Sequence, residues 1–248
     1  MAERFHVDAV LAPGTRLALP PRAARHVQVL RLQPGAVIVL FDGTGGQWPA
    51  RVLRMARQAV EVEVGAHEPL EREPQRSVTL AFGMPANDRM DTLIEKATEL
   101  GATSLQPLVT ERSVLRVAGD RAVRKAAHWQ AVAAAACEQC GRNRMPTIAE
   151  PATLVAWLGA LPPPGTATSR LLLSAPGAAG AAGGAAAQSL QGGGDVLVLS
   201  GPEGGLSAAE HAAARSRGFI DHSLGPRVLR ADTAPLAALV LLLGSDHA

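Results

Sequence analysis

Aromatic residues, cysteines and long apolar runs are scarce in this sequence. Tyrosine is absent and aromatic residues make up 3% of the 248 residues, so an extensive base-stacking surface is excluded. The longest apolar run, Ala234–Leu243, has about half of the roughly 20 residues that a membrane-spanning helix needs. Glu3, Arg4 and Asp8 interrupt any signal-peptide core. We therefore expect a cytoplasmic protein without a membrane segment.

The two cysteines, Cys137 and Cys140, form a lone C-x-x-C pair. A structural zinc site takes about four ligands, and no second cysteine pair is present to supply them. A redox role needs a thioredoxin-like context, which the sequence lacks. We expect no metal, and interpret both cysteines as helix residues of a protein from a reducing compartment.

Basic residues are concentrated near the N-terminus. The net charge of +2 says little by itself, but the first 60 residues hold eight arginines against three acidic residues. A locally basic segment favours a polyanionic partner. A well-solvated surface gives the same pattern, so charge alone leaves both interpretations open.

The first part of the chain has the pattern of a small β-rich domain, which we predict to be a barrel over residues 1–70. Short β-like runs alternate there with turn signals. These runs are Val37–Phe41, Trp48–Leu53 and Val60–Val64. The polar segment 67–76 carries two prolines and is typical of a linker. A second domain is predicted over residues 77–248.

In the second domain, strand patterns alternate with helix patterns, which predicts an α/β fold with a mostly parallel sheet. The predicted strands are Val78–Phe82, Ser104–Leu108, Arg170–Leu173 and Val196–Leu199. The predicted helices are Met90–Leu100, Asp120–Gln139 and Thr233–Leu243, with a capping box at Ser207–Glu210 opening another. The Ala- and Gly-rich segment 175–195 is interpreted as a flexible insertion.

The stretch Leu199-Ser-Gly-Pro-Glu-Gly-Gly-Leu-Ser207 lies between a predicted buried strand and a capped helix, where ligands of open α/β sheets bind. Its glycines allow a ligand to approach the backbone closely. It is not a P-loop, because no Gly-Lys-Ser/Thr follows, and it lacks the G-x-G-x-x-G dinucleotide fingerprint. A plain strand–turn–helix connection is the simpler interpretation of this stretch alone.

A second stretch, Ser223–Ala234, is apolar at Leu224, Val228 and Leu229 but too irregular for a strand or a helix. Such a loop must lie against something, and an adenine ring, which is flat and partly apolar, is a suitable occupant. Asp232 or Thr233 is placed to cap the helix that follows. A buried loop between two elements is the alternative.

Together and in this order, the two stretches resemble the C-terminal signature of the SPOUT methyltransferases. The most similar group is the bacterial family that methylates N3 of a uridine in 16S ribosomal RNA. The resemblance spans nearly the whole chain. It is carried by further motifs at Arg4–Val7, His26–Gly35, Phe41–Gly45, Lys96–Gly101, Thr110–Ser113 and Glu138–Arg142.

The resemblance implies an N-terminal PUA-like RNA-binding β-barrel, a SPOUT domain with a deep trefoil knot over about 170–243, and a homodimer. It also implies S-adenosyl-L-methionine as the cofactor and 16S rRNA of the small ribosomal subunit as the partner. The implied cofactor-binding residues are Leu173, Leu199, Ser200, Gly201, Pro202, Glu203, Gly204, Leu224, Gly225, Val228, Leu229, Arg230, Thr233 and Ala234.

Methylation of uracil N3 requires help from the protein, because this nitrogen carries a proton and is a poor nucleophile at neutral pH. We expect Arg230 and Arg142 to stabilise the developing anion, with Arg112 as a third candidate. Glu138 or Glu203 is expected to act as a base or to orient an arginine. The expected RNA-binding residues are Arg4, Arg22, Arg25, Arg31, Arg112 and Arg142.

Two other functions remain open at this point. One is a SPOUT enzyme that methylates a ribose 2′-hydroxyl or another rRNA or tRNA position, against which the PUA-like half argues. The other is a non-catalytic RNA-binding protein, against which the intact Gly201–Gly205 and Leu224–Gly225 argue.

The last predicted helix is apolar on all sides, which predicts that it is buried on all sides. One face is expected to pack within the domain and the other against a second subunit. The two stripes are Leu236, Leu239, Val240 and Leu243 on one side, and Pro235, Ala238, Leu241 and Leu242 on the other.

Overall fold

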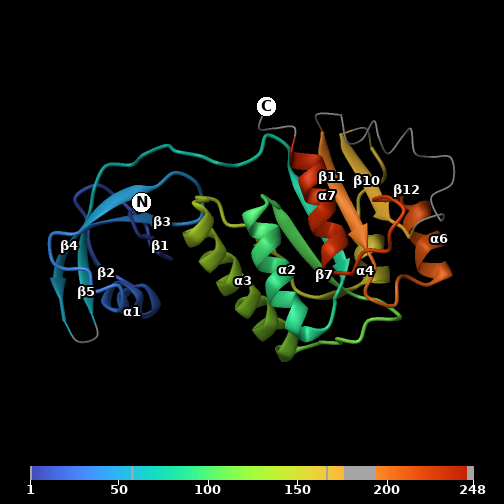
Figure 1. Ribbon diagram of the computed structural model, residues 1–248, viewed down its shortest axis with the longest axis horizontal. Coiled ribbons are helices and arrows are strands. Elements are labelled where there is room, and N and C mark those ends of the chain that lie inside the picture. The colour runs from blue at the N-terminus through green and yellow to red at the C-terminus, as the bar shows by residue number, and fades with distance from the viewer. Residues whose placement is uncertain (1, 57–58, 166, 176–193, 245–248) are drawn as a thin grey trace. The chain divides into compact units, whose positions relative to one another are not determined.

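The computed structural model describes residues 2–56, 59–165, 167–175 and 194–244, so most of the insertion predicted at 175–195 lies outside the described residues. The chain forms two compact units (Figure 1). The first consists of residues 1–73 and 134–145, and the second of residues 74–133 and 146–248. Helix α3 (Asp120–Cys140) therefore contributes to both units.

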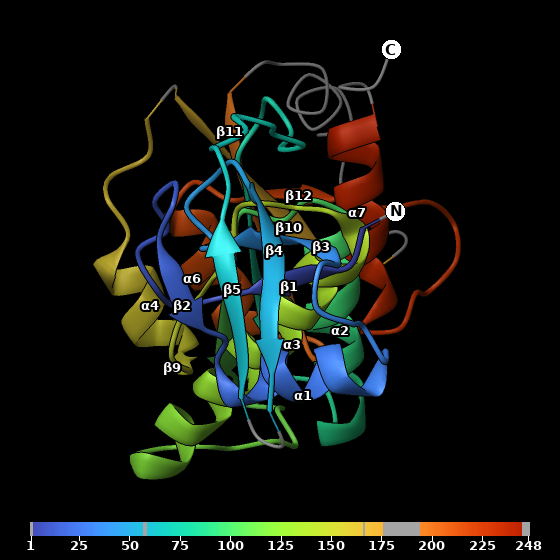
Figure 2. The same ribbon diagram turned by 90° about the vertical axis from the view of Figure 1, so that its left-hand side faces the viewer.

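The first unit is built on a five-stranded sheet with the order β1-β3-β4-β5-β2 (Figure 2). The strands are β1 (Arg4–His6), β2 (Arg16–Ala18), β3 (Val37–Phe41), β4 (Trp48–Met55) and β5 (Val60–Val64). β1 runs parallel to β3, and the other neighbours are antiparallel. The three strands predicted from the sequence are confirmed, whereas the two outer strands were not predicted.

Alternating apolar residues build the core of this unit. In β5 the side chains of Val60, Val62 and Val64 are buried and the two glutamates between them are not, as expected for a sheet with one face in the core. Helix α1 (Pro21–Val29) buries Ala23, Ala24 and Val27 in the same cluster. Its proline at the first turn is tolerated because the amide there has no partner within the helix.

Residues 67–73, which belong to the segment interpreted as a linker, are hydrogen-bonded along the first unit. The backbone amides and carbonyls of Gln47 and Glu68 pair with each other at 2.9 and 2.8 Å. Asn143 donates from Nδ2 to the carbonyl oxygen of Leu70 at 2.5 Å. Arg4 donates to Asn143 Oδ1 at 2.5 Å, which ties the segment 134–145 to β1. The polar groups of the segment find partners within the unit, and this fixes its path.

The second unit contains a parallel sheet with the order β12-β10-β11-β6-β7-β8, and β9 also pairs with β7. All these pairings are parallel, which confirms the sheet type predicted from the sequence. The strands are β6 (Val78–Gly83), β7 (Ser104–Val109), β8 (Thr147–Ile148), β9 (Ala152–Thr153), β10 (Thr168–Leu173), β11 (Asp195–Ser200) and β12 (Ile220–His222).

Helices cover both faces of this sheet (Figure 1). Helices α2 (Asn87–Glu99) and α7 (Thr233–Leu243) pack on one face, together with Trp129 of α3. Helices α4 (Leu154–Ala160) and α6 (Ala208–Ser216) pack on the other. Because both faces are covered, the central strands are apolar runs without alternation.

The two helices that follow the candidate ligand loops begin differently. Ser207 Oγ accepts from the Glu210 amide and Glu210 returns a bond to the Ser207 amide, so the predicted capping box of α6 is confirmed. The cap predicted for α7 is wrong: Asp232 has a helical backbone and its side chain makes no cap hydrogen bond. The amides of Thr233 and Ala234 donate instead to the carbonyl oxygen of Arg230.

Neither apolar stripe predicted for α7 is buried as a whole. Leu239 and Leu242 are fully buried in the core of the second unit, whereas Val240 and Leu241 are 52% and 53% exposed. The buried and exposed residues come from both stripes, so the face left uncovered by its own unit is centred on Val240 and Leu241.

Cys137 is buried on α3, and this burial raises the pKa of its thiol to about 12. Its Sγ donates to the carbonyl oxygen of Arg144. Within the part of the chain that the structure describes, no three His, Cys, Asp or Glu side chains are grouped as metal ligands. None of the described helices is long and apolar enough to cross a membrane.

Candidate functional site

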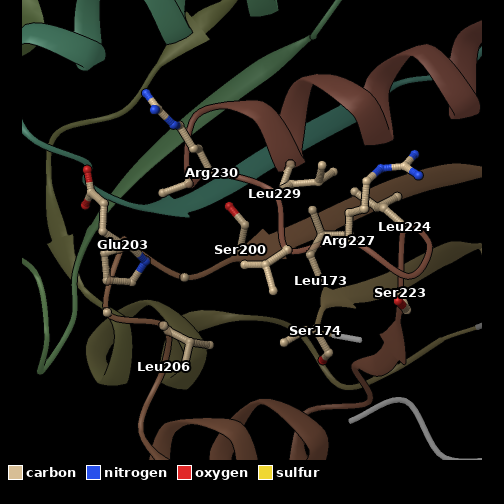
Figure 3. A pocket seen from close by; sticks show the side chains of 18 of the residues that line it. Leu173, Ser174, Ser200, Glu203, Leu206, Ser223, Leu224, Arg227, Leu229 and Arg230 are labelled. Carbon is tan, nitrogen blue, oxygen red and sulfur yellow. The ribbon is translucent and has the colours of Figure 1, made fainter. Parts of the chain in front are cut away.

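A cavity of about 570 Å³ lies in the second unit at the carboxyl ends of β10 and β11 (Figure 3). Two loops form most of its wall, residues 200–206 after β11 and residues 223–231 between β12 and α7. Arg89 of α2 and His211 of α6 complete it. Because all strands run the same way, their carboxyl ends meet at one edge, which is the usual ligand-binding edge of such sheets.

Loop 200–206 needs glycine because it turns back closely on itself. A Cβ on Gly201 would lie 2.9 Å from the Leu206 amide nitrogen and 3.0 Å from the Gly205 carbonyl carbon. A Cβ on Gly83, at the end of β6, would lie 2.4 Å from Pro202 Cδ. Both glycines are therefore required by backbone packing. Because they have no side chain, backbone atoms form this part of the cavity wall.

Three side chains fix this loop and the residues next to it. Arg112 donates to the carbonyl oxygen of Gly204 at 2.9 Å. Glu203 accepts from the Ala86 amide at 3.0 Å and lies 3.8 Å from an Arg89 nitrogen. The buried Glu210 carboxylate accepts from the Glu111 amide as well as from the capping box. The loop is thus fixed before any ligand binds, which lowers the entropic cost of binding.

The floor of the cavity carries polar groups of two kinds. Ser200 Oγ is buried and has no hydrogen-bond partner among the described residues, so it is available to a ligand. Ser174 Oγ instead donates to Asp221 at 2.5 Å, and Arg215 donates to the other carboxylate oxygen at 2.6 Å. Burial alone would raise the pKa of Asp221, but these hydrogen bonds outweigh it and lower that pKa. Asp221 is therefore ionised, and Ser174 presents acceptor lone pairs to the cavity.

Loop 223–231 supplies both apolar and cationic surface. Leu224 packs against the core cluster, while Val228 is 82% exposed although it lines the cavity. Arg227 and Arg230 are exposed and no carboxylate of the described residues lies within 4 Å of either. In Figure 3, Glu203 and Arg230 lie toward one end of the cavity and Arg227 toward the other. The cavity can therefore accept a ligand with a flat apolar part and leaves positive charge for a second, anionic molecule.

Most residues expected to bind a cofactor meet in this cavity. Those that line it are Leu173, Ser200, Gly201, Pro202, Glu203, Gly204, Leu224, Val228, Leu229, Arg230 and Ala234. Leu199, Gly225 and Thr233 do not line it. Leu199 is fully buried in the cluster on the α4 and α6 side of the sheet, because adjacent strand residues point to opposite faces.

The expected catalytic residues are divided between the units. Arg230 lines the cavity. Arg142 is 4% exposed and donates twice to the Glu73 carboxylate, at 3.0 and 2.5 Å. Glu138 accepts from the His6 amide at 3.0 Å and lies 3.7 Å from an Arg22 nitrogen. Both of these residues thus have packing roles within the first unit.

The expected RNA-binding residues also differ in their surroundings. Arg25, Arg31 and Arg112 are exposed. Arg4 is held by Gln47 and Asn143 and lies 5.0 Å from the centre of the Phe41 ring, and burial lowers its pKa. The burial of Arg142 removes its guanidinium from the surface of its unit, which argues against a direct RNA contact there.

Sequence reasoning missed several cavity residues. Arg89, Ser174, His211 and Arg227 line the cavity, and Gly83 permits the path of its wall. Ser174 directly follows a predicted strand end, so its position at the ligand-binding edge was a usable signal. Arg89 and His211 come from helix turns that only tertiary packing brings to the site.

Comparison with known proteins gives matches over both units. A family model described as an RNA methyltransferase domain matches residues 71–243, and one described as an RNA methyltransferase PUA domain matches residues 19–65. The chain is 34% identical over 212 residues to the ribosomal RNA small subunit methyltransferase E of Synechocystis sp., covering 86% of this chain and 67% of that protein.

Solved structures match over nearly the full length. The ribosomal RNA small subunit methyltransferase E of Neisseria gonorrhoeae, bound to S-adenosylmethionine, has a TM-score of 0.87 and 32% identity, covering 99% of this chain and 98% of that one. A putative methyltransferase of Legionella pneumophila, in complex with the same cofactor, has a TM-score of 0.89 and 31% identity, with the same coverage.

Proposed function

The chain belongs to the RNA methyltransferase family, as its sequence predicts, and from this premise we propose that it methylates N3 of a uridine in 16S ribosomal RNA. The observation that carries the proposal is the cavity at the ends of β10 and β11, in a chain that matches cofactor-bound structures along its length. The substrate is 16S rRNA of the small ribosomal subunit, and the reaction takes place in the cytoplasm. The trefoil knot implied by the sequence resemblance stays a prediction.

The residues of the cavity suit S-adenosyl-L-methionine. Its volume of about 570 Å³ lies within the range of small-molecule sites. Leu173, Leu224 and Leu229 offer apolar contacts to an adenine, and the backbone of loop 200–206 allows close approach. The unpartnered Ser200 Oγ is a ready hydrogen-bonding group. We assign cofactor binding to these residues and to the remaining cavity-lining residues of loops 200–206 and 223–231.

When bound, S-adenosyl-L-methionine supplies a methyl group on a sulfonium centre. The protein then mainly has to position the acceptor base and manage its charge. We assign Arg230 to stabilise the negative charge on the uracil when N3 gives up its proton to solvent water before it accepts the methyl group. A base role for Glu203 would compete with its bonds to Ala86 and Arg89. Catalytic roles for Arg142 and Glu138 stay predictions.

We propose that the first unit binds RNA through exposed arginines, chiefly Arg25 and Arg31. A base paired through N3 hides this atom, so the target uridine has to be unstacked or single-stranded. Arg4, Arg22 and Arg142 are retained as weaker candidates because each has partners within the unit.

We also propose a homodimer through the exposed face of α7. Val240 and Leu241 leave apolar surface on a helix whose other side is fully buried, and a two-fold contact would place the same helix on both sides. Leu241→Asp should give a folded monomer, whereas Leu239→Asp should unfold the second unit. Light scattering and circular dichroism measure both. A dimeric Leu241→Asp variant would contradict this contact.

The reaction is tested with purified protein, labelled S-adenosyl-L-methionine and 16S rRNA, free or in small subunits, followed by nucleoside mass spectrometry. We expect one methyl group per rRNA on uracil N3. Methylation of a ribose or of tRNA would support the other SPOUT activities. Cofactor binding without transfer to any RNA would support a non-catalytic RNA-binding protein.

A further inference from the structure

Two groups of cations in the second unit differ in their partners, and Arg76, Lys125, Arg170 and Arg217, none of which is exposed, belong to neither. Arg89, Lys96 and Arg215 each have a carboxylate within 4 Å. Among the residues that the structure describes, the other group has no such ion pair and is exposed. This group comprises Arg112, Arg116, Arg121, Arg124, Arg227 and Arg230. Two of its members line the cavity, and the remaining four follow one another within 13 residues of chain.

The first of the four arginines between residues 112 and 124 contacts the cavity wall. Arg112 donates to Gly204 of loop 200–206 at 2.9 Å, and Arg116 donates to the carbonyl oxygen of Glu111 at 3.0 Å. Arg121 and Arg124 stand three residues apart at the start of α3, where side chains at that spacing lie on the same side of the helix. The opposite side of α3 is buried through Ala122 and Trp129. We call these four residues the arginine strip.

The arginine strip has more N–H donors than its hydrogen bonds to backbone carbonyls use. A guanidinium has five N–H groups. Arg112 and Arg116 each donate a hydrogen bond to a backbone carbonyl oxygen, which does not neutralise their charge. Glu111 and Asp120 are the only acidic residues from 111 to 124. A strip of this kind concentrates positive potential, and arginine binds phosphate oxygens in a bidentate manner.

We propose that the arginine strip binds phosphate groups of the RNA substrate, guiding its backbone to the cavity. The proposal rests on the proposed function and extends it, because it adds Arg116, Arg121 and Arg124 to Arg112, the residue of the second unit that was already expected to bind RNA. RNA is favoured over an acidic protein because Arg112 of the strip contacts loop 200–206 of the cavity in which an RNA base is to react, and because guanidinium and phosphate match in geometry.

The test measures binding of the full-length protein to a single-stranded RNA oligonucleotide without cofactor, at several KCl concentrations. Arg121→Gln and Arg124→Gln should each lower the log–log salt slope by about 0.7, and the double variant by about 1.4. Lys96→Gln removes the same charge from a residue already paired with Glu95 and Glu99, and it should leave the slope unchanged. Calorimetry should give wild-type affinity for S-adenosyl-L-methionine in all of these variants.

A wild-type slope in the double variant would overturn the proposal, as would an equal loss in Lys96→Gln, which would reduce the effect to net charge. An equal loss of binding to polyglutamate would also overturn it, because the strip would then be a general anion-binding surface. If the wild type transferred no methyl group but the slopes fell as expected, the proposed reaction would fail and the RNA-binding strip would stand.

Discussion

The arginines discussed above have different roles in the two units. In the first unit, Arg4, Arg142 and Arg144 join residues that are distant in sequence, through hydrogen bonds and ion pairs. In the second unit, Arg227 and Arg230 beside the cavity have no carboxylate partner among the described residues. Arg4, Arg142 and Arg144 thus stabilise the first unit, whereas Arg227 and Arg230 leave positive charge available at the cavity.

The burial of each arginine and the presence of an ion-pair partner distinguish these roles. The number of charges in a unit does not. Arg142 is 4% exposed with a carboxylate at 2.5 Å, whereas Arg230 is exposed at a cavity. Removing one member of a buried pair leaves an uncompensated charge and costs stability. Removing an unpartnered surface cation costs little stability but costs any function that depends on its charge.

The largest effect is expected from Arg142→Met. It leaves Glu73 without its partner, and the free energy of unfolding should fall by roughly 3 kcal/mol. Arg144→Met is the matched control in the same segment, because its pair with Glu71 is largely exposed, and it should cost less than about 1 kcal/mol. Urea denaturation measures both. Equal losses would contradict the structural role assigned to Arg142.

Arg230→Met should have the opposite pattern, with little loss of stability and a large loss of activity. Its stability should stay within about 0.5 kcal/mol of wild type, while kcat falls by roughly 100-fold because charge on the base is no longer stabilised. The affinity for S-adenosyl-L-methionine should change little, so the loss should appear in kcat. Steady-state kinetics and calorimetry measure these quantities. An unchanged kcat would remove Arg230 from the mechanism.

The cavity wall depends on backbone packing rather than on ion pairs, and Gly201→Ala tests this. The added Cβ would collide with the backbone of Gly205 and Leu206, so cofactor affinity should fall by at least about 10-fold. Gly159→Ala on α4 is the control, because a Cβ there would meet no atom within 4 Å and the residue does not line the cavity. Isothermal calorimetry of the two folded variants distinguishes the cases, and equal affinities would refute the packing argument.

Within the first unit the comparison predicts unequal RNA contacts. Arg25→Gln with Arg31→Gln should lower the salt slope of RNA binding by about 1.4. Arg22→Gln should change it less, because Arg22 already faces Glu138 at 3.7 Å. Fluorescence anisotropy at graded KCl concentrations measures the slopes. A larger effect of Arg22→Gln would mean that its ion pair opens to RNA.

The smallest effect is expected at the cysteines. Burial raises the pKa of Cys137 to about 12, so its thiol should be inert to iodoacetamide at neutral pH, while the less buried Cys140 reacts faster. The double variant Cys137→Ser and Cys140→Ala should keep its activity. Mass spectrometry after alkylation and a methylation assay check both points, and activity lost on chelation would contradict the absence of a metal role.

Much of the fold was predictable because periodicity and caps report local structure. The runs Val78–Phe82 and Val196–Leu199 are strands, as predicted. Ser207 and Glu210 form the predicted capping box at the start of α6. β1 was missed because a three-residue strand carries no periodic signal and depends on its parallel partner β3. The return of residues 134–145 to the first unit was missed because it rests on long-range bonds such as Arg4 to Asn143.

Loops 200–206 and 223–231 line the cavity, and glycine and irregular apolar patterns mark both in the sequence. Leu199 was expected in the site but is buried on the other layer of the sheet, because a continuous apolar strand does not tell which residue faces which layer. Which of these residues bind a cofactor stays a prediction. Arg142 and Arg230 look alike in sequence, since the partner of Arg142 lies 69 residues away at Glu73.

The most direct test of the central claim is nucleoside analysis of 16S rRNA from a strain that lacks this gene. We expect one N3-methyluridine to disappear, to return with the wild-type gene, and to stay absent with Arg230→Met or Gly201→Ala expressed at equal levels. Unchanged N3-methyluridine in the deletion strain, or the loss of a different modification, would contradict the account.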